Sequence, residues 1–251
     1  MSNYNKLLNN LDILKLENTK NYLSEYLDNI VNNNITFLDG LLKITDKEIA
    51  FKDARAKIQN VKTAAFPFQK ELSDFDFDFQ PGLSKEKIMD LATLRYIEEQ
   101  KNILFVGNSG VGKTHLAVSL GIEAAKKRIS TYFISCNDLI QKLLKAHQEN
   151  REDNIIRHYL KYKLLIIDEI GYLPINSLGA NLFFQLIAKR YEKKSTIITT
   201  NQTFSKWGDI FSDKIIANAI LDRLLHHSEV INITGPSYRV KDKIKKSEIR
   251  V

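Results

Sequence analysis

Residues 105–120 read FVGNSGVGKTHLAVSL and place three glycines and a lysine between a short apolar run and a segment with helical spacing. Within them, residues 107–114 match the pattern GxxxxGK[ST] at every fixed position. Glycines allow backbone N–H groups to turn inward around a phosphate, and a helix that follows presents its positive N-terminal end to the same charge. A chance match somewhere in a chain of this length is roughly a 1% event at average residue frequencies. We therefore predict that this loop binds a nucleoside triphosphate.

The pattern also predicts what individual residues of the loop do. Lys113 is expected to contact the β- and γ-phosphates, and the Thr114 hydroxyl to coordinate Mg²⁺. We expect His115 to pack or to form a hydrogen bond in the first helical turn rather than to take part in catalysis. The residues predicted to hold the nucleotide are Gly107, Asn108, Ser109, Gly110, Val111, Gly112, Lys113, Thr114 and His115.

From Ile103 onward, short β-rich runs alternate with segments whose apolar residues recur at i, i+3 and i+4. The predicted helical segments include Thr114–Lys127, Asp138–Gln148 and Leu178–Glu192. Strands that are apolar throughout and alternate with helices predict an α/β fold, with a mainly parallel five-stranded sheet covered by helices on both faces. The predicted strands are Ile103–Val106, Thr131–Ile134, Leu164–Ile167, Thr196–Thr199 and Val230–Ile233.

The N-terminal part of the chain has helical spacing only. Leucines and tyrosines recur at this spacing up to Ile30, the run Asn32-Asn33-Asn34 predicts a break, and Phe37–Ala65 reads as a second helical stretch. The stretch Phe66-Pro67-Phe68 ends this pattern, because the residue before proline avoids the α region. We predict a small all-α domain at residues 1–68 and a second domain at residues 69–251.

Strict alternation of Asp and Phe at residues 74–79 predicts an extended linker between the two domains. Its phenylalanines, Phe75, Phe77 and Phe79, fall on one side and its carboxylates on the other. They either cover the adenine or seat the linker on the core, and we favour the second role.

Two carboxylates, Asp168 and Glu169, end the apolar run that begins at Leu164. Alone, such an ending is typical of a strand reaching the surface. After an intact phosphate loop, a strand-terminal acid binds Mg²⁺ through water, which suits Asp168, and Glu169 can orient and deprotonate the attacking water. The fourth strand ends in polar residues at Asn201, and ligands of such sheets bind beyond the carboxyl ends of the strands. Asn201 therefore either reaches the γ-phosphate or holds the lytic water, or it forms a turn.

Two arginines complete the set of candidates. Arg223 in ILDRL and Arg239 in GPSYR have an ordinary interpretation as surface or ion-paired residues. Beside a bound triphosphate, a guanidinium can instead stabilise the charge that spreads in the transition state.

With these motifs, the chain resembles the IstB-like ATP-binding proteins, the helper ATPases of insertion-sequence transposition. They are related to the bacterial helicase loader DnaC within the AAA+ class. The resemblance covers about residues 35–241 and is specific as an ordered set. Beyond the phosphate loop, its motifs are KTAAFP at 62–67, DFDF at 74–77, DEIGYLP at 168–174, WGDIF at 207–211, DRL at 222–224 and SYR at 237–239.

The resemblance implies a role for each matching residue. Lys113 and Thr114 belong to Walker A, Asp168 and Glu169 to Walker B, and Asn201 to the first sensor. It further implies that Arg223 is an arginine finger acting on ATP held by a neighbouring subunit and that Arg239 is the second sensor. The ATP-bound state is then a homo-oligomer assembled on duplex DNA. The implied task is to select or remodel target DNA and to recruit or stimulate the cognate transposase. A replicative helicase loader is the alternative.

The predicted DNA contacts lie on the helix through residues 47–65. Lys52, Arg55 and Lys62 fall within about 80° of one another at ~100° per residue, beside an apolar stripe that runs from Phe51 to Ala65. The apolar stripe can pack while the basic one faces phosphate, or the basic stripe is simply a solvated face. The formal charge of +7 is spread along the chain. It suits an anionic partner such as DNA, and an ordinary basic domain without such a partner explains it equally well.

Composition gives an expectation about the compartment. The single cysteine, Cys136, forms no internal disulfide, and no apolar run approaches the ~20 residues that cross a bilayer. The N-terminus lacks the uninterrupted apolar core of a signal peptide. We therefore expect a cytoplasmic protein without a membrane partner.

The adjacent His226 and His227 have no further ligands at metal spacing, so the sequence assigns no zinc site to them.

Overall fold

The computed structural model describes residues 2–32 and 35–241, and the chain divides into two compact units between Gln59 and Asn60. The first unit is helical, as predicted, and contains α1 (Asn3–Ile13), α2 (Glu17–Asn32) and most of α3 (Phe37–Thr63). Asn33 and Asn34 of the predicted break lie outside the described residues. The division between these units falls within α3, whereas the sequence predicts a domain boundary after residue 68; that boundary stays a prediction.

A buried carboxylate holds α2 to α3 in the first unit. Glu48 on α3 is only 5% exposed, and its Oε2 accepts hydrogen bonds from the Thr19 backbone N–H (2.8 Å) and the Thr19 hydroxyl (3.0 Å). Thr19 lies in the first turn of α2, where backbone N–H groups lack helical partners and favour negative charge. The Tyr26 hydroxyl adds a bond to the Gly40 carbonyl at 2.7 Å.

The second unit is built on the predicted parallel sheet. Five strands lie in the order β2-β3-β4-β1-β5, and all four neighbouring pairs are parallel. Each predicted strand is present, and its ends lie within three residues of the expected ones. The strands are β1 (Asn102–Gly107), β2 (Thr131–Ser135), β3 (Leu164–Ile170), β4 (Ser195–Thr200) and β5 (Ser228–Ile233).

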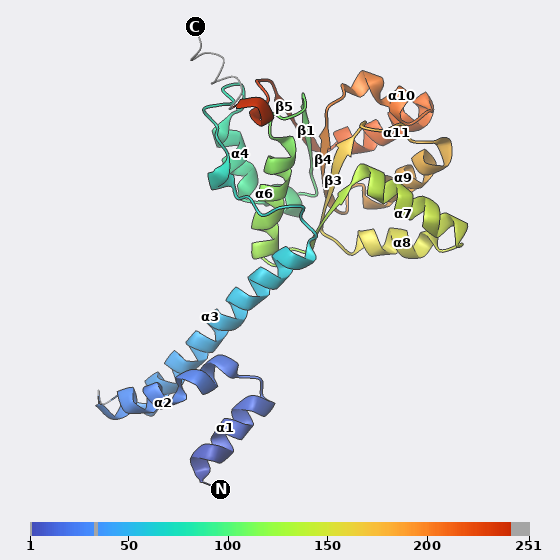
Figure 1. Cartoon of the computed structure of the whole chain (residues 1–251). Helices are drawn as coiled ribbons and strands as arrows, with labels where there is room; N and C mark the ends of the chain where they lie inside the picture. Colours follow the sequence, from blue (N-terminus) through green and yellow to red (C-terminus); the bar gives the residue numbers. More distant parts are fainter. Residues whose placement is uncertain (1, 33–34, 242–251) are drawn as a thin grey trace. The chain divides into compact units, whose positions relative to one another are not determined.

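Helices cover both faces of this sheet, as Figure 1 shows. One face packs against α4 (Lys85–Ala92), α5 (Arg95–Glu98) and α6 (Lys113–Lys126). The other face packs against α7 (Cys136–Gln148), α8 (Glu152–Leu160), α9 (Ser177–Arg190), α10 (Trp207–Ile210) and α11 (Lys214–Leu225). Strands β1, β3 and β4 are almost wholly buried between the two layers of helices, which explains the apolar runs of β1 and β3 and the paired isoleucines at the centre of β4. Short 3-10 turns, η1 (Leu72–Asp74), η2 (Phe204–Lys206) and η3 (Tyr238–Val240), complete the unit.

The linker at residues 74–79 is not extended, so that prediction was wrong. It begins in η1, and the Phe79 N–H then donates to the Asp76 carboxylate at 3.1 Å, which closes a turn. An aspartate side chain that bonds backbone nearby favours such turns over a strand. Phe75 does face the core, as expected for one side of the linker. Its side chain is 9% exposed, and its ring centroid lies 4.8 Å from that of Phe77.

No helix among residues 2–32 and 35–241 is long and apolar enough to cross a membrane.

Candidate nucleotide-binding site

The phosphate loop joins β1 to α6 and requires glycine at two of its positions. Gly110 and Gly112 have φ values of 84° and 101°, in the left-handed region that side chains other than glycine rarely adopt. At Gly112 a Cβ would also lie 2.5 Å from the Phe75 ring, and at Gly110 it would lie 2.0 Å from the Ser237 hydroxyl. Backbone conformation and close neighbours therefore both keep side chains out of the loop.

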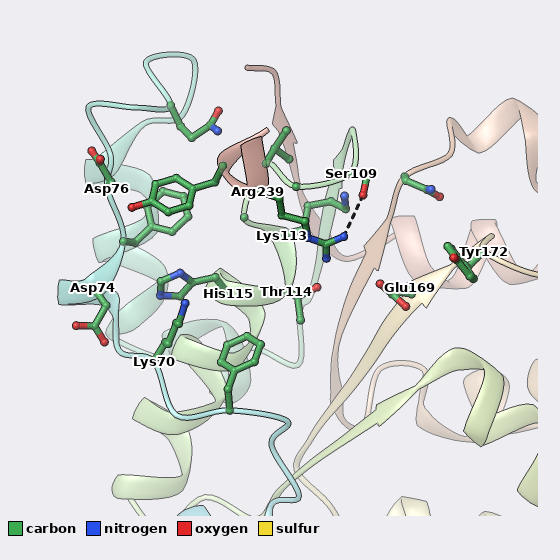
Figure 2. A pocket seen from close by; sticks show the side chains of 18 residues that line it. Lys70, Asp74, Asp76, Ser109, Lys113, Thr114, His115, Glu169, Tyr172 and Arg239 are labelled. Carbon is green, nitrogen blue, oxygen red and sulfur yellow. Dashed lines mark hydrogen bonds between the residues drawn. The ribbon is translucent and has the colours of Figure 1, made fainter. Parts of the chain in front are cut away.

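A cavity of about 610 Å³ opens above this loop. Its floor is formed by Ser109–His115, and its walls come from the 68–80 segment, the ends of β3 and β4, and the C-terminal Tyr238 and Arg239. Figure 2 shows these side chains converging from separate elements. The cavity lies at the carboxyl edge of the sheet, where α/β proteins bind their ligands. Gly107 and Asn108, also predicted to hold the nucleotide, lie at the base of the loop rather than in the cavity lining.

Lys113 is held by the loop itself. Its Nζ donates to the carbonyl oxygens of Gly107 and Asn108, each at 2.8 Å. Burial lowers the pKa of Lys113, and the positive charge of Arg239 acts in the same direction. Figure 2 shows the two cations side by side, with Arg239 Nη1 3.5 Å from the Ser109 hydroxyl. Two neighbouring cations at a glycine-rich loop form a site for a highly charged anion.

Asp168 and Thr114 form the pair of oxygens expected for a magnesium site. The Thr114 hydroxyl donates to Asp168 Oδ1 at 2.9 Å, and the Thr199 hydroxyl donates to the same oxygen. Asp168 is only 6% exposed, and burial raises the pKa of its carboxyl while the two hydroxyl bonds oppose that shift. Hydroxyl and carboxylate oxygens are the hard ligands that Mg²⁺ prefers, so these residues fit the ion.

A β-bulge turns Glu169 away from the core beside Asp168. The register of β3 against β4 shifts between Ile167 and Ile170, so Asp168 and Glu169 together face one residue, Thr199. Glu169 has a φ of 62°, is exposed, and lines the cavity, while its N–H donates to the Thr199 hydroxyl at 2.9 Å. One threonine therefore holds the backbone of Glu169 and the carboxylate of Asp168.

The other predicted residues divide between this cavity and other places. Asn201 and His115 line the cavity. His115 Nε2 lies 3.1 Å from the Glu71 carbonyl, which confirms the expected hydrogen bond but places its partner outside the helix; burial lowers the pKa of the imidazole. Arg223 does not line the cavity. It lies on α11, where Nη1 donates to the Ala219 carbonyl at 3.0 Å and the guanidinium lies 4.7 Å from the Phe184 ring centroid.

The basic residues predicted to contact DNA are partly neutralised by neighbours. Lys52 lies 3.6 Å from the Glu48 carboxylate, and Arg55 lies 2.6 Å from that of Glu17. Lys62 is exposed near the end of α3. Ile58, in the middle of the apolar stripe that runs from Phe51 to Ala65, is 58% exposed. The stripe is therefore not buried there, contrary to expectation.

Sequence reasoning missed three residues that shape the site. The first is Thr199, for which the polar end of β4 was the available signal. The second is Tyr238, whose N–H donates to the Gly110 carbonyl at 2.8 Å and ties the C-terminal segment to the phosphate loop. The third is Gln80, which is buried in the cavity wall and donates to the Pro236 carbonyl at 2.8 Å. These last two contacts join residues far apart in the chain, and no local pattern predicts them.

The parallel sheet, its phosphate loop and the acidic end of β3 define a P-loop nucleotide-binding protein of the AAA+ class. Comparison with protein families matches residues 9–246 to the IstB-like ATP binding protein family. The chain therefore belongs to this family, as its motifs indicated.

Individual relatives agree with this assignment. The chain is 53% identical, over 98% of both sequences, to the ATP-binding protein of insertion sequence IS232 from Bacillus thuringiensis subsp. berliner. It is 40% identical to that of insertion sequence IS21 from Pseudomonas aeruginosa, over 94% of this chain and 89% of the relative.

Solved structures share the fold. The DnaC helicase loader is 30% identical, with a TM-score of 0.52 over 59% of this chain and 87% of that one. The replication initiator DnaA bound to AMPPCP and single-stranded DNA has a TM-score of 0.54 at 19% identity, over 73% of this chain and 57% of its own.

Proposed function

We propose that this protein is a Mg²⁺-dependent ATPase that oligomerises on duplex DNA and assists transposition. It would select or remodel target DNA and recruit or stimulate the cognate transposase. The observation that carries the proposal is the single cavity that joins the phosphate loop to Glu169, with the paired oxygens of Thr114 and Asp168 beside it. The names of the relatives, ATP-binding proteins of insertion sequences, supply the biological setting.

The predicted site residues in and beside the cavity each have a task in this proposal. Lys113 exchanges its two loop carbonyls for phosphate oxygens, while Thr114 and Asp168 hold Mg²⁺, which neutralises charge on the phosphates. Glu169 orients the attacking water and accepts its proton, and Asn201 positions the same water. Arg239, beside Lys113, adds positive charge where the transition state needs it.

Assembly would complete the site. Arg223 lies outside the cavity of its own subunit, so we propose that it acts on ATP held by a neighbouring subunit. An arginine supplied in this way makes hydrolysis depend on oligomerisation, because an arginine finger contributes about 10³–10⁵ in rate in related phosphoryl transfers. A mixture of Arg223→Ala and Lys113→Ala subunits is then expected to regain part of the activity that each variant alone lacks.

DNA binding is proposed for Lys52, Arg55 and Lys62 within a chain of net charge +7. Contacts with phosphates weaken as salt displaces them, so the affinity for duplex DNA should fall steeply between about 50 and 200 mM salt. We expect the protein to act in the cytoplasm, where the transposon DNA and the transposase are accessible.

A replicative helicase loader is the second candidate, because the DnaC helicase loader shares the fold at 30% identity. That function requires binding to a hexameric helicase. Co-purification with the helicase, and not with the transposase, would favour it over the first proposal.

Hydrolysis tests the main proposal directly. Glu169→Gln keeps the size of the side chain and removes its basicity, so DNA-stimulated phosphate release should fall by at least about 10² while ATP-driven assembly persists. Glu98→Gln, a similar exchange at an exposed residue outside the cavity, should behave as the wild type. Equal turnover in the Glu169→Gln variant and the wild type, or no stimulation by DNA at any salt concentration, would count against the proposal.

A further inference from the structure

A cluster of three metal-ligating side chains lies at the amino edge of the sheet, away from the nucleotide cavity. Glu192 belongs to the connection from α9 to β4, and His226 and His227 to the connection from α11 to β5. In a parallel sheet the amino ends of the strands share one edge, opposite the carboxyl ends that carry the phosphate loop. The sequence showed no ligand near the two histidines, whereas the fold brings in Glu192 from 35 positions before His227.

The distances in this cluster suit one shared ion. Glu192 Oε1 lies 3.2 Å from His227 Nε2 and 3.7 Å from His226 Nδ1, and ligand atoms of all three residues lie within 4.8 Å of one another. Two donors that each bind zinc at about 2.1 Å with a tetrahedral angle are roughly 3.4 Å apart. The two distances from Glu192 lie on either side of that value, and the ligand nitrogens of the two histidines lie within 4.8 Å of each other, so a shared ion needs rotation of exposed side chains and no movement of the backbone.

The backbone around the cluster is already fixed. The His227 carbonyl accepts the Asn102 N–H of β1 at 2.8 Å. The buried Asn102 side chain donates to the Leu224 carbonyl at 3.1 Å and accepts the Thr196 N–H at 2.9 Å, so one amide ties the end of α11 to the start of β4, next to the two connections that carry the ligands. A site whose ligands are held in place before binding loses less entropy when the ion arrives.

We propose that Glu192, His226 and His227 form a binding site for a divalent transition-metal ion, with zinc as the best fit. Two imidazole nitrogens and one carboxylate favour zinc over Mg²⁺, which prefers oxygen ligands, and three protein ligands leave a fourth position for water. The ion would clamp the α9–β4 connection to the α11–β5 connection. This site is separate from the proposed Mg²⁺ site and does not depend on the proposed function.

One neighbour competes with the metal. The Tyr191 hydroxyl lies 2.6 Å from His226 Nδ1, the nitrogen that faces Glu192. It must release that nitrogen before the ion can bind. Tyr191→Phe removes the competitor without removing a ligand, so this variant should bind the ion more tightly than the wild type.

Cobalt(II) is a suitable probe, because its visible absorption reports the coordination geometry without any measurement of activity. We would titrate the full-length protein with Co²⁺, without nucleotide or Mg²⁺, and then displace the cobalt with Zn²⁺. The wild type should saturate at one ion per chain with the spectrum of a site of low coordination number. Zn²⁺ should also raise the midpoint of thermal unfolding of the wild type, because an ion that binds only the folded state stabilises it.

Variants identify the ligands. Affinity should fall tenfold or more in His226→Ala, His227→Ala and Glu192→Gln, which alter exposed side chains and should leave the fold intact. The matched control is His147→Ala, because His147 is a half-exposed histidine that lies 3.7 Å from Glu152. No saturable cobalt spectrum in the wild type, unchanged affinity in the three ligand variants, or an equal loss in His147→Ala would overturn the proposal.

Discussion

Replacing Thr199 with valine tests whether one buried hydroxyl organises the catalytic edge of the sheet. Thr199 has no exposed surface, and its hydroxyl donates to the Asp168 carboxylate while it accepts the Glu169 N–H at 2.9 Å. Valine has nearly the same shape and suits a strand, so the exchange removes both hydrogen bonds and leaves the packing in place.

The expected cost follows from these two bonds. A hydrogen bond to a charged group contributes about 1.5–3 kcal/mol, and a neutral one contributes about 1 kcal/mol. Because Asp168 keeps its bond to Thr114, we expect the free energy of unfolding to fall by about 2–4 kcal/mol in total. Loss of one of the two hydroxyls that oppose the effect of burial should also raise the pKa of Asp168 further. Mg²⁺-dependent hydrolysis should fall at least tenfold, since about 1.4 kcal/mol of lost positioning gives that factor.

Thr200→Val provides a matched control on the same strand. Thr200 is equally buried, and its hydroxyl donates to the Ile170 carbonyl at 2.7 Å and accepts the Gln202 N–H at 3.1 Å, but it contacts neither carboxylate. Urea unfolding should therefore show a loss of stability in both variants. The Mg²⁺ concentration needed for half-maximal hydrolysis should rise only in Thr199→Val. If both variants show the same Mg²⁺ dependence as the wild type, the hydroxyl does not position the carboxylates and the reasoning is refuted.

Two further predictions concern the phosphate loop and the cysteine. Gly112→Ala places a methyl group on a residue with a φ of 101° and directs it towards the Phe75 ring. The free energy of unfolding should therefore fall by about 1–3 kcal/mol, and binding of a fluorescent ATP analogue should be abolished. Unchanged affinity for the analogue would contradict this account of the loop. Burial raises the pKa of Cys136 to about 12 from its ordinary value of 9.0, so at pH 8 the folded protein should resist a thiol reagent that labels the urea-unfolded chain at once. The unfolded chain loses this proton first as the pH rises, so the free energy of unfolding should decrease between pH 9 and pH 12; rapid labelling at pH 8 would show that the thiol is accessible.

Much of the fold could be predicted because its signals are local. The order of apolar runs and helical segments predicted five parallel strands covered by helices, and the strand ends agree with the structure within three residues. The linker at residues 74–79 shows where such reasoning fails. Alternation of Asp and Phe has the period of a strand, but Asp76 bonds the Phe79 N–H and closes a turn instead.

The candidate site divides in the same way. Lys113, Thr114 and Asp168 could be named from the sequence, because the phosphate loop and the acidic strand end each occupy a short stretch of chain. Thr199 could not, since its role depends on a bulge that sets two residues of β3 against one residue of β4. Register between strands is decided by packing across the sheet and not by the residues of one strand.

The sequence by itself determined that this protein has a P-loop nucleotide-binding fold of the IstB-like family. The glycines of the loop, the period of the strands and the acidic end of a strand can each be recognised within a short stretch of chain. Only the tertiary structure decided how Glu169 is turned out of its strand, that Arg223 lies outside the nucleotide cavity, and that Glu192 meets His226 and His227. Each of these depends on residues from separate elements, whose positions are fixed when the sheet and its helices pack together.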